Sequence, residues 1–212
     1  MSLKIADHWN KVYATQPVES LGWYEENPSP SIDLISRCDL KADDLILDVG
    51  SGATSLMRYL VESGYRNLMA LDISSEALER LRASIPVEHS QSVLFIQADI
   101  RSAEWIAEVG EVGLWHDRAL LHFLTEASDR EAYIDRLHAL VKKDGSVVIG
   151  AFSLEGASHC SGLPIQQYSV DTITSLIGKD FQLEESEDYE YVMPSGDKRP
   201  YVYARYRRVE RE

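Results

Sequence analysis

Short apolar runs alternate along the chain with stretches in which apolar residues recur every three or four positions, beginning at Leu45. The first pattern is typical of β-strands buried on both faces, and the second is typical of amphipathic helices. Strands that alternate with helices predict an α/β fold with a mostly parallel, doubly wound sheet and helices on both faces. The predicted strands read LILDV, NLMALDI, VLFIQADI, VGLWHDR and SVVIGAF.

Turn-forming and capping residues mark where the predicted helices begin and end. Gly64 follows the helix after the first strand, where a left-handed residue is favoured. Ser74 and Pro86 bound the next helix. A capping-box pattern at Ser128 predicts a third helix that runs to Val141. The spacing of these helices predicts βαβ units.

The two ends of the chain depart from this alternation. Near the C-terminus, a capped helix over residues 169–177 precedes two strand-like segments that flank PSGDK, which predicts an antiparallel hairpin at the end of the sheet. Before Leu45, two helices are joined by the aromatic loop LGWYEENP, and the second has Ser29 as its cap and Pro30 in its first turn. We therefore expect a single domain over residues 1–212, with a helical lid segment at 1–40 and a Rossmann-like core at 45–212.

Composition and charge narrow the class of protein. The chain has 212 residues, of which 44% are apolar, enough for one substantial core. A net charge of −14, from 35 acidic and 21 basic residues, argues against a nucleic-acid partner. The two cysteines are too few for a disulfide framework, the N-terminus lacks a secretory signal, and the longest apolar runs are too short to span a bilayer. These features predict a cytoplasmic protein without a membrane partner.

Acidic residues end three successive predicted strands. The first strand ends in Asp48 and turns through Gly50 and Gly52 into a helix, which brings backbone N–H groups close to a ligand. Asp72 ends the second strand about 20 residues later, the distance at which a carboxylate reaches ribose hydroxyls in such sheets, and Asp99 ends the third. Three carboxylates would repel a pyrophosphate and favour a ligand with cationic groups and hydrogen-bond donors. S-adenosylmethionine fits this description.

At these residues the chain resembles the class I S-adenosylmethionine-dependent methyltransferases, from Leu45 to the C-terminal hairpin. It is similar to a bacterial group of such enzymes that shares the segments WHDRA, HFL and CSGLP. The resemblance implies S-adenosylmethionine as the cofactor, S-adenosylhomocysteine as its product, and the following cofactor-binding residues: Asp48, Gly50, Ser51, Gly52, Asp72, Ile73, Asp99, Ile100 and Trp115. Thr54 replaces the third glycine of the turn, and its hydroxyl is expected to cap the next helix.

In this family, the segment after the fourth strand borders both the cofactor and the acceptor. This makes His116, Asp117 and His122 the candidate catalytic residues, with the two histidines as possible bases if the acceptor must lose a proton. The alternatives are that His116 packs against the sheet and that Asp117 and Arg118 form a structural ion pair. Arg118 is also a candidate substrate-binding residue.

Aromatic residues near the N-terminus and a loop after the fifth strand are expected to complete the acceptor site. Trp23 and Tyr24 are candidate lid residues, whereas Trp9 and Tyr13 lie four apart and are expected to pack their helix onto the core. His159 and Cys160 are further substrate-binding candidates. They are too few to form a metal site, so no metal is predicted.

Three functions are compatible with these residues. The first is transfer of a methyl group to an oxygen, nitrogen or sulfur atom of a small molecule, which the compact chain and the HDRALL segment favour. The second is methylation of a protein lysine, because the acidic surface would attract a basic protein segment. The third is a protein that binds the cofactor without turnover, as a sensor or a subunit.

Overall fold

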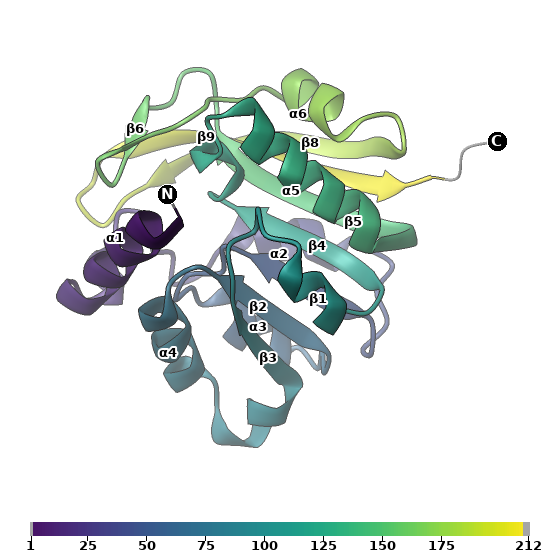
Figure 1. Cartoon of the computed structure of the whole chain (residues 1–212), viewed down its shortest axis with the longest axis horizontal. Coiled ribbons are helices and arrows are strands. Elements are labelled where there is room, and N and C mark those ends of the chain that lie inside the picture. Colours follow the sequence, from purple (N-terminus) through teal and green to yellow (C-terminus); the bar gives the residue numbers. More distant parts are fainter. Residues whose placement is uncertain (1, 210–212) are drawn as a thin grey trace.

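The computed structural model describes residues 2–209, in which seven strands form one sheet flanked by helices (Figure 1). The strand order is β3-β2-β1-β4-β5-β9-β8. The strands are β1 (Leu45–Val49), β2 (Leu68–Asp72), β3 (Val93–Gln97), β4 (Val112–Arg118), β5 (Val141–Phe152), β8 (Phe181–Val192) and β9 (Lys198–Arg208). Strands β1 to β5 are parallel, which confirms the predicted doubly wound sheet.

Helices cover both faces of this sheet, as the alternating pattern predicted. One face packs against α2 (Ser29–Ser36), α3 (Leu56–Glu62) and α4 (Ser75–Ser84), and the other against α5 (Ala127–Leu140) and α6 (Val170–Ile177). Helix α1 (Ser2–Thr15) contacts α4 and lies beyond the end of the sheet (Figure 1). No helix within residues 2–209 combines the length and the apolar character needed to cross a membrane.

The C-terminal hairpin confirms the predicted antiparallel end of the sheet. Strand β9 pairs antiparallel with β5 on one side and with β8 on the other, so the last strand lies inside the sheet and β8 forms its edge. Most side chains of β8 are exposed or half-buried, and acidic residues are frequent between Glu184 and Glu190. Charge at an exposed edge discourages pairing with a strand of another molecule.

Two predicted helix caps are present, and three are corrected. Ser74 accepts a hydrogen bond from the Ala77 N–H at the start of α4, and a capping box opens α6. The capping box expected at Ser128 is absent, because α5 begins one residue earlier and Ser128 lies in its first turn. Thr54 precedes α3 without capping it and lines a cavity instead. Ser29 is the first residue of α2 rather than its cap.

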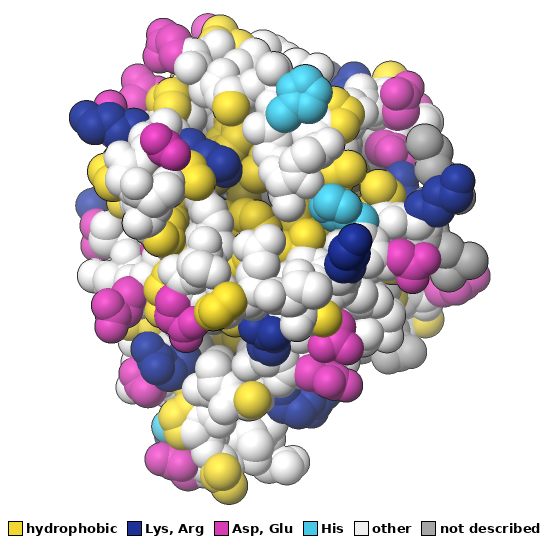
Figure 2. Space-filling model, turned by 90° about the vertical axis from the view of Figure 1, so that its left-hand side faces the viewer, with side chains coloured by type: hydrophobic (Ala, Val, Ile, Leu, Met, Phe, Trp, Pro, Cys, Tyr) yellow, Lys and Arg dark blue, Asp and Glu magenta, His cyan; other side chains and the backbone are white. Residues whose placement is uncertain are grey.

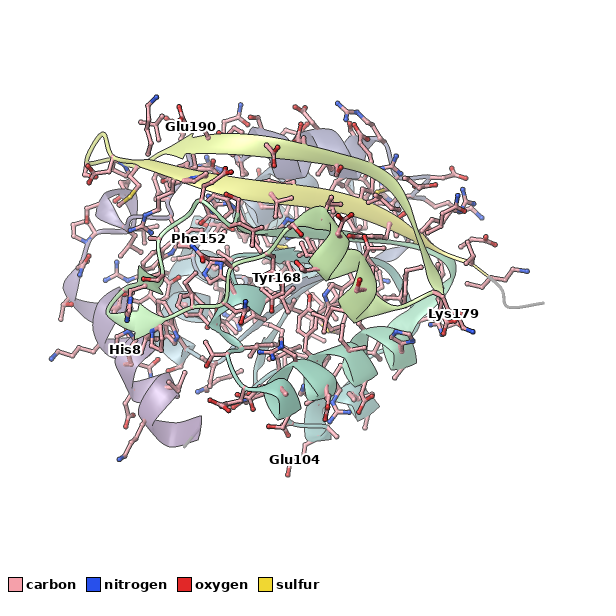
Figure 3. All side chains as sticks on the ribbon, turned by 90° about the horizontal axis from the view of Figure 1, so that it is seen from above. His8, Glu104, Phe152, Tyr168, Lys179 and Glu190 are labelled. Atoms are coloured by element: carbon pink, nitrogen blue, oxygen red, sulfur yellow. The ribbon has the colours of Figure 1, made fainter. Side chains whose placement is uncertain are left out.

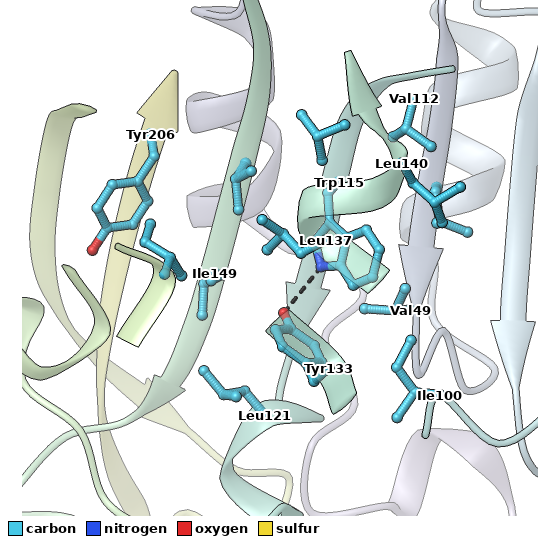
Figure 4. Close-up of a cluster of buried hydrophobic side chains, with 14 of the residues drawn as sticks. Val49, Ile100, Val112, Trp115, Leu121, Tyr133, Leu137, Leu140, Ile149 and Tyr206 are labelled. Atoms are coloured by element: carbon cyan, nitrogen blue, oxygen red, sulfur yellow. Dashed lines mark hydrogen bonds between the residues drawn. The ribbon is translucent and has the colours of Figure 1, made fainter. Parts of the chain in front are cut away.

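One hydrogen bond joins β4 to α5 inside the core. The Trp115 Nε1–H donates to the Tyr133 hydroxyl oxygen at 3.0 Å, and the two rings meet edge to face (Figure 4). The Tyr133 hydroxyl also hydrogen-bonds the Asp117 carboxylate. Trp115, Tyr133 and Asp117 are fully buried. These polar groups therefore depend on one another for hydrogen-bond partners.

We predict that Tyr133→Phe lowers the free energy of unfolding by about 1–3 kcal/mol, because it leaves the Trp115 N–H buried without an acceptor. Urea unfolding followed by circular dichroism measures this change. The control is Tyr59→Phe, because Tyr59 is 41% exposed and its variant is expected to unfold like the wild type. Equal stability of the two variants would contradict the structural role of the Trp115–Tyr133 bond.

Candidate active site

A cavity of about 110 Å³ lies at the carboxyl ends of the parallel strands, between the sheet and α1. In Figure 2, hydrophobic side chains gather at the centre of this side of the molecule, with charged side chains mostly around them. Figure 3 shows Phe152, at the end of β5, at the same end of the molecule as His8 on α1, whereas Lys179 lies at the opposite end. The cavity thus occupies the place where doubly wound sheets bind ligands.

The turn after β1 forms part of the cavity wall and requires glycine. Gly50 and Gly52 have φ angles of +65° and +57°, values that other residues rarely adopt. A Cβ atom at Gly50 would lie 2.8 Å from the Leu120 Cβ, and one at Gly52 would lie 2.5 Å from the Tyr13 Oη. Side chains from after β4 and from α1 therefore pack directly against the bare backbone of this turn.

Asp72, at the end of β2, orders the same turn. Its Oδ2 accepts a hydrogen bond from the Gly52 N–H and its Oδ1 accepts one from the Ser74 N–H, both at 2.8 Å. Burial raises the pKa of the Asp72 carboxyl to about 6, even though the Ser74 and Gly52 N–H groups act in the opposite direction. The carboxylate lines the cavity next to Ile73.

Asp99 follows β3 and lines the cavity beside Ile100. The Arg101 side chain donates to both of its carboxylate oxygens, from Nε at 2.8 Å and from Nη2 at 2.6 Å. Arg101 also donates to Asp129 at 3.0 Å, which links this loop to α5. The three strand-end carboxylates therefore lie at one edge of the sheet, as predicted, but the Asp99 carboxylate is already paired with Arg101.

Asp48 belongs to a buried chain of hydrogen bonds behind the glycine turn. His116 Nδ1 lies 2.7 Å from the Asp48 Oδ1, and His116 Nε2 lies 2.8 Å from the Ser31 Oγ on α2. All three residues are at most 3% exposed. They line a second, smaller cavity of about 10 Å³, which Ser51 also borders. His116 thus joins β4 to β1 and α2.

Arg118 connects the N-terminal loop with the C-terminal hairpin. Its Nη2 lies 2.8 Å from the Glu25 Oε2, its Nη1 donates to the Trp23 carbonyl oxygen at 2.7 Å, and its Nε donates to the Tyr203 hydroxyl at 3.1 Å. The alternative that Arg118 pairs with Asp117 is wrong, because adjacent residues of a strand point to opposite faces. Asp117 instead accepts hydrogen bonds from the N–H groups of Leu120 and Leu121.

Strand alternation also places Trp115 away from both cavities. Trp115 and Asp117 point toward α5, whereas His116 and Arg118 point toward α2 and the N-terminal loop.

His122 follows β4 in a short 3-10 helix and is fully buried, with its ring stacked on Phe152 at 4.5 Å between centroids. Neither ring nitrogen has a hydrogen-bond partner among the described residues. Burial, Arg118 and Arg199 lower the pKa of His122 to about 3, so its ring is neutral.

Aromatic side chains of the N-terminal segment cover the cavity. Trp9, Tyr13 and Trp23 line it, the Trp9 and Trp23 rings lie 5.5 Å apart, and the Trp23 Nε1–H donates to the Tyr13 hydroxyl at 3.2 Å. Trp9 and Tyr13 were expected only to pack α1 onto the core, so their position in the cavity wall was missed. Tyr24 does not line the cavity; its carbonyl oxygen accepts a hydrogen bond from the Tyr191 hydroxyl.

The loop after β5 contributes one of its two candidate residues. Cys160 is buried in β6 (His159–Cys160), which pairs with β7 (Leu163–Pro164), and it lines the cavity. His159 is exposed and contacts Ser158 instead. The Arg199 Nη1–H donates to the Cys160 Sγ at 3.3 Å. Sequence patterns did not indicate Arg199, Phe123 or Tyr201, because each sits in an ordinary turn or strand.

Comparisons with known proteins agree with this geometry. Residues 46–145 match the family model described as a methyltransferase domain. A SAM-dependent methyltransferase from Anabaena variabilis has a similar structure, with a TM-score of 0.78 and 16% identity over 98% of this chain and 94% of that chain. A second similar structure is a 1,6-didemethyltoxoflavin-N1-methyltransferase from Burkholderia thailandensis with bound 1,6-didemethyltoxoflavin and S-adenosylhomocysteine. Its TM-score is 0.66, with 16% identity over 98% of this chain and 85% of that chain. No curated protein matches the sequence.

The matched segment covers residues 46–145, which include the glycine turn and strands β2 to β4. Together with the fold, the match supports an enzyme that uses S-adenosylmethionine, as the sequence predicted. The structure offers the features that this cofactor needs: glycines where a Cβ would collide with neighbours, and a cavity bordered by carboxylates. The acceptor is a separate question.

We predict that two aspartates, Asp72 and Asp117, titrate near pH 6, because burial raises the pKa of each carboxyl to about 6. The folded state then keeps protons that the unfolded state has released, so these two groups make the protein less stable as pH rises from about 4 to about 6. Carboxyl ¹³C NMR of aspartate-labelled protein measures both values. Asp72→Asn and Asp117→Asn should each remove one of the two titrations with a midpoint near pH 6. Titration of every aspartate near pH 4 would contradict the prediction.

Proposed function

We propose that the protein transfers the methyl group of S-adenosylmethionine to a small-molecule acceptor. The observation that carries this proposal is the position of the N-terminal segment, whose Trp9, Tyr13 and Trp23 close over the cavity at the glycine turn. Arg118 fastens this segment through the Trp23 carbonyl oxygen and the Glu25 carboxylate. A cavity covered in this way suits an acceptor that fits inside it, rather than the surface of a large protein.

The cofactor would lie along the carboxyl ends of β1, β2 and β3. We propose that the turn from Gly50 to Gly52, with Ser51 and the nearby Asp48, receives the methionine part. Asp72 with Ile73 would hold the ribose, and Asp99 with Ile100 would contact the adenine. Support comes from the cavity, because Gly50, Gly52, Asp72, Ile73, Asp99 and Ile100 all line it, whereas Asp48 and Ser51 line the smaller cavity. Trp115 has no place in this proposal, because its indole lies on the other face of β4.

When bound, S-adenosylmethionine supplies a methyl group on a positively charged sulfur, and in-line attack by an acceptor electron pair forms the new bond as the carbon–sulfur bond breaks. The chain contributes mainly by orienting the acceptor and excluding water. We call the part of the cavity lined by Trp23, Phe123, Cys160 and Tyr201 its acceptor end. No described side chain of this set is a base near neutral pH, because burial raises the pKa of Cys160 and Tyr201 above their usual values. We propose that the attacking atom of the acceptor already has an available lone pair, so that no side chain has to remove a proton from it before methyl transfer.

This places the candidate catalytic residues in supporting roles. His116 is held between Asp48 and Ser31, and we propose that it positions the glycine turn instead of removing a proton. Asp117 would position the segment after β4 through the Leu120 and Leu121 N–H groups. His122, with its pKa lowered to about 3 by burial and two arginines, is a poor base at neutral pH and would shape the acceptor end.

We predict that Gly52→Val weakens binding of S-adenosylhomocysteine at least about tenfold, equivalent to about 1.4 kcal/mol, because its side chain would collide with Tyr13. Isothermal titration calorimetry measures the affinity. The matched control is Gly110→Val, because a Cβ there meets no atom within 4 Å, and this variant should bind like the wild type. No binding by the wild type would refute the proposed function, and normal binding by Gly52→Val would refute only the placement of the cofactor.

We also predict where the methyl group goes. Cell extract incubated with the protein and S-adenosylmethionine labelled in its methyl group should yield label in the small-molecule fraction. A catalytically impaired control, Gly52→Val, should yield none. Label in a discrete protein band would instead favour the lysine methyltransferase alternative, and absence of label from both fractions would favour a cofactor-binding protein without turnover.

A further inference from the structure

Arg199 lies beside the cavity, where it contacts Cys160 of the cavity wall, and it has no acidic partner among the described side chains. Its Nη1–H donates to the Cys160 Sγ, and its guanidinium carbon lies 5.5 Å from the centre of the Phe152 ring. A neutral thiol is a weak acceptor, whereas a guanidinium offers five N–H donors in a planar fork. The side chain is thus held in place but leaves most of its donors available to another group.

Three segments hold this guanidinium near the cavity. Cys160 and Tyr201 line the cavity, and Tyr201 follows Arg199 by two positions in β9, so both side chains lie on the same face of the sheet. On the other side is the loop that precedes Trp23, where a Cβ atom at Gly22 would lie 3.5 Å from the Arg199 Nη2. Arg199 therefore sits between the N-terminal lid and the wall formed by Cys160.

The other charges around the cavity do not neutralise Arg199. Glu25 is already paired with Arg118, at 2.8 Å. Asp72 bonds backbone N–H groups, and Asp99 is held by Arg101, both at the opposite end of the cavity. The field of the two arginines acts on His122 as well: after burial, Arg118 and Arg199 are the causes that lower its pKa. The acceptor end thus carries one net positive charge from its described side chains.

We propose that the methyl acceptor is a small, flat organic acid whose carboxylate binds Arg199. A guanidinium matches a carboxylate with two parallel hydrogen bonds, which makes this pairing both strong and directional. The aromatic side chains of Trp23, Phe123 and Tyr201 line the space where the body of such a molecule would lie. The inference rests on the proposed methyl transfer and names the class of acceptor for that same site.

The overall charge of −14 acts against this assignment, because it favours cations around the protein. At physiological ionic strength, however, charges separated by more than about 8 Å through solvent are largely screened. Arg199 contacts Cys160 of the cavity wall directly, so its charge acts on the cavity at short range. A cationic acceptor, such as a lysine side chain, would meet an unpaired guanidinium there.

The test compares benzoate, benzamide and benzylamine, which share one ring and differ in charge, on protein saturated with S-adenosylhomocysteine. Quenching of tryptophan fluorescence and ligand-observed NMR measure their affinities, independently of turnover. Benzoate should bind at least about tenfold more tightly than benzamide, and benzylamine should bind weakest. Equal binding of the three, tighter binding of benzylamine, or no binding of benzoate would overturn the proposal while leaving cofactor binding, and hence the proposed function, intact.

Variants then assign the preference to Arg199. Arg199→Met should remove the preference for benzoate over benzamide, whereas Arg199→Lys, which keeps a point charge, should retain part of it. Arg207→Met is the matched control, because Arg207 lies on the same strand, has a side chain that is 43% exposed, and carries the same charge. Unchanged discrimination in Arg199→Met, or the same loss in Arg207→Met, would show that Arg199 does not bind the carboxylate.

Discussion

The structure depends on satisfying one buried carboxylate at the centre of the sheet. Asp48 is 3% exposed, and a charge in such a place is tolerated only when it is paired and hydrogen-bonded. His116 supplies the partner from the neighbouring strand, and Ser31 supplies the partner of His116 from α2. This requirement fixes α2 against β1 and β4, and the loop before α2 then carries Trp23 and Glu25 over the glycine turn.

The fold and the part of the cavity at the ends of β1, β2 and β3 were predictable because their signals are local. The strand runs, Gly64, Ser74 and the hairpin residues act through backbone preferences that hold wherever the segment lies, and five strands appear where expected. Gly50 and Gly52 have the positive φ angles that make glycine necessary there. Asp72 and Asp99 follow from topology alone, since parallel strands bring their carboxyl ends to one edge.

The acceptor end was less predictable because its residues come together only in three dimensions. β4 is buried on both faces, so its pattern of apolar residues does not reveal that His116 and Arg118 share one side while Trp115 and Asp117 share the other. Tyr13 lies 59 residues before Asp72 in the chain yet meets the same turn. Arg199 is one of several arginines in β9, and its contacts with Cys160 and Phe152, which come from distant parts of the chain, distinguish it.

Arg118 ties the loop that carries Trp23 and Glu25 to the C-terminal hairpin. Its side chain is 7% exposed while it contacts both the Glu25 carboxylate and the Trp23 carbonyl oxygen of the lid, and the Tyr203 hydroxyl of the hairpin. Leaving a buried charge without its partner costs about 3–5 kcal/mol, so an opened lid would leave Arg118 unstable unless water reached it. The contacts of Arg118 therefore help to hold the loop that carries Trp23 against the hairpin.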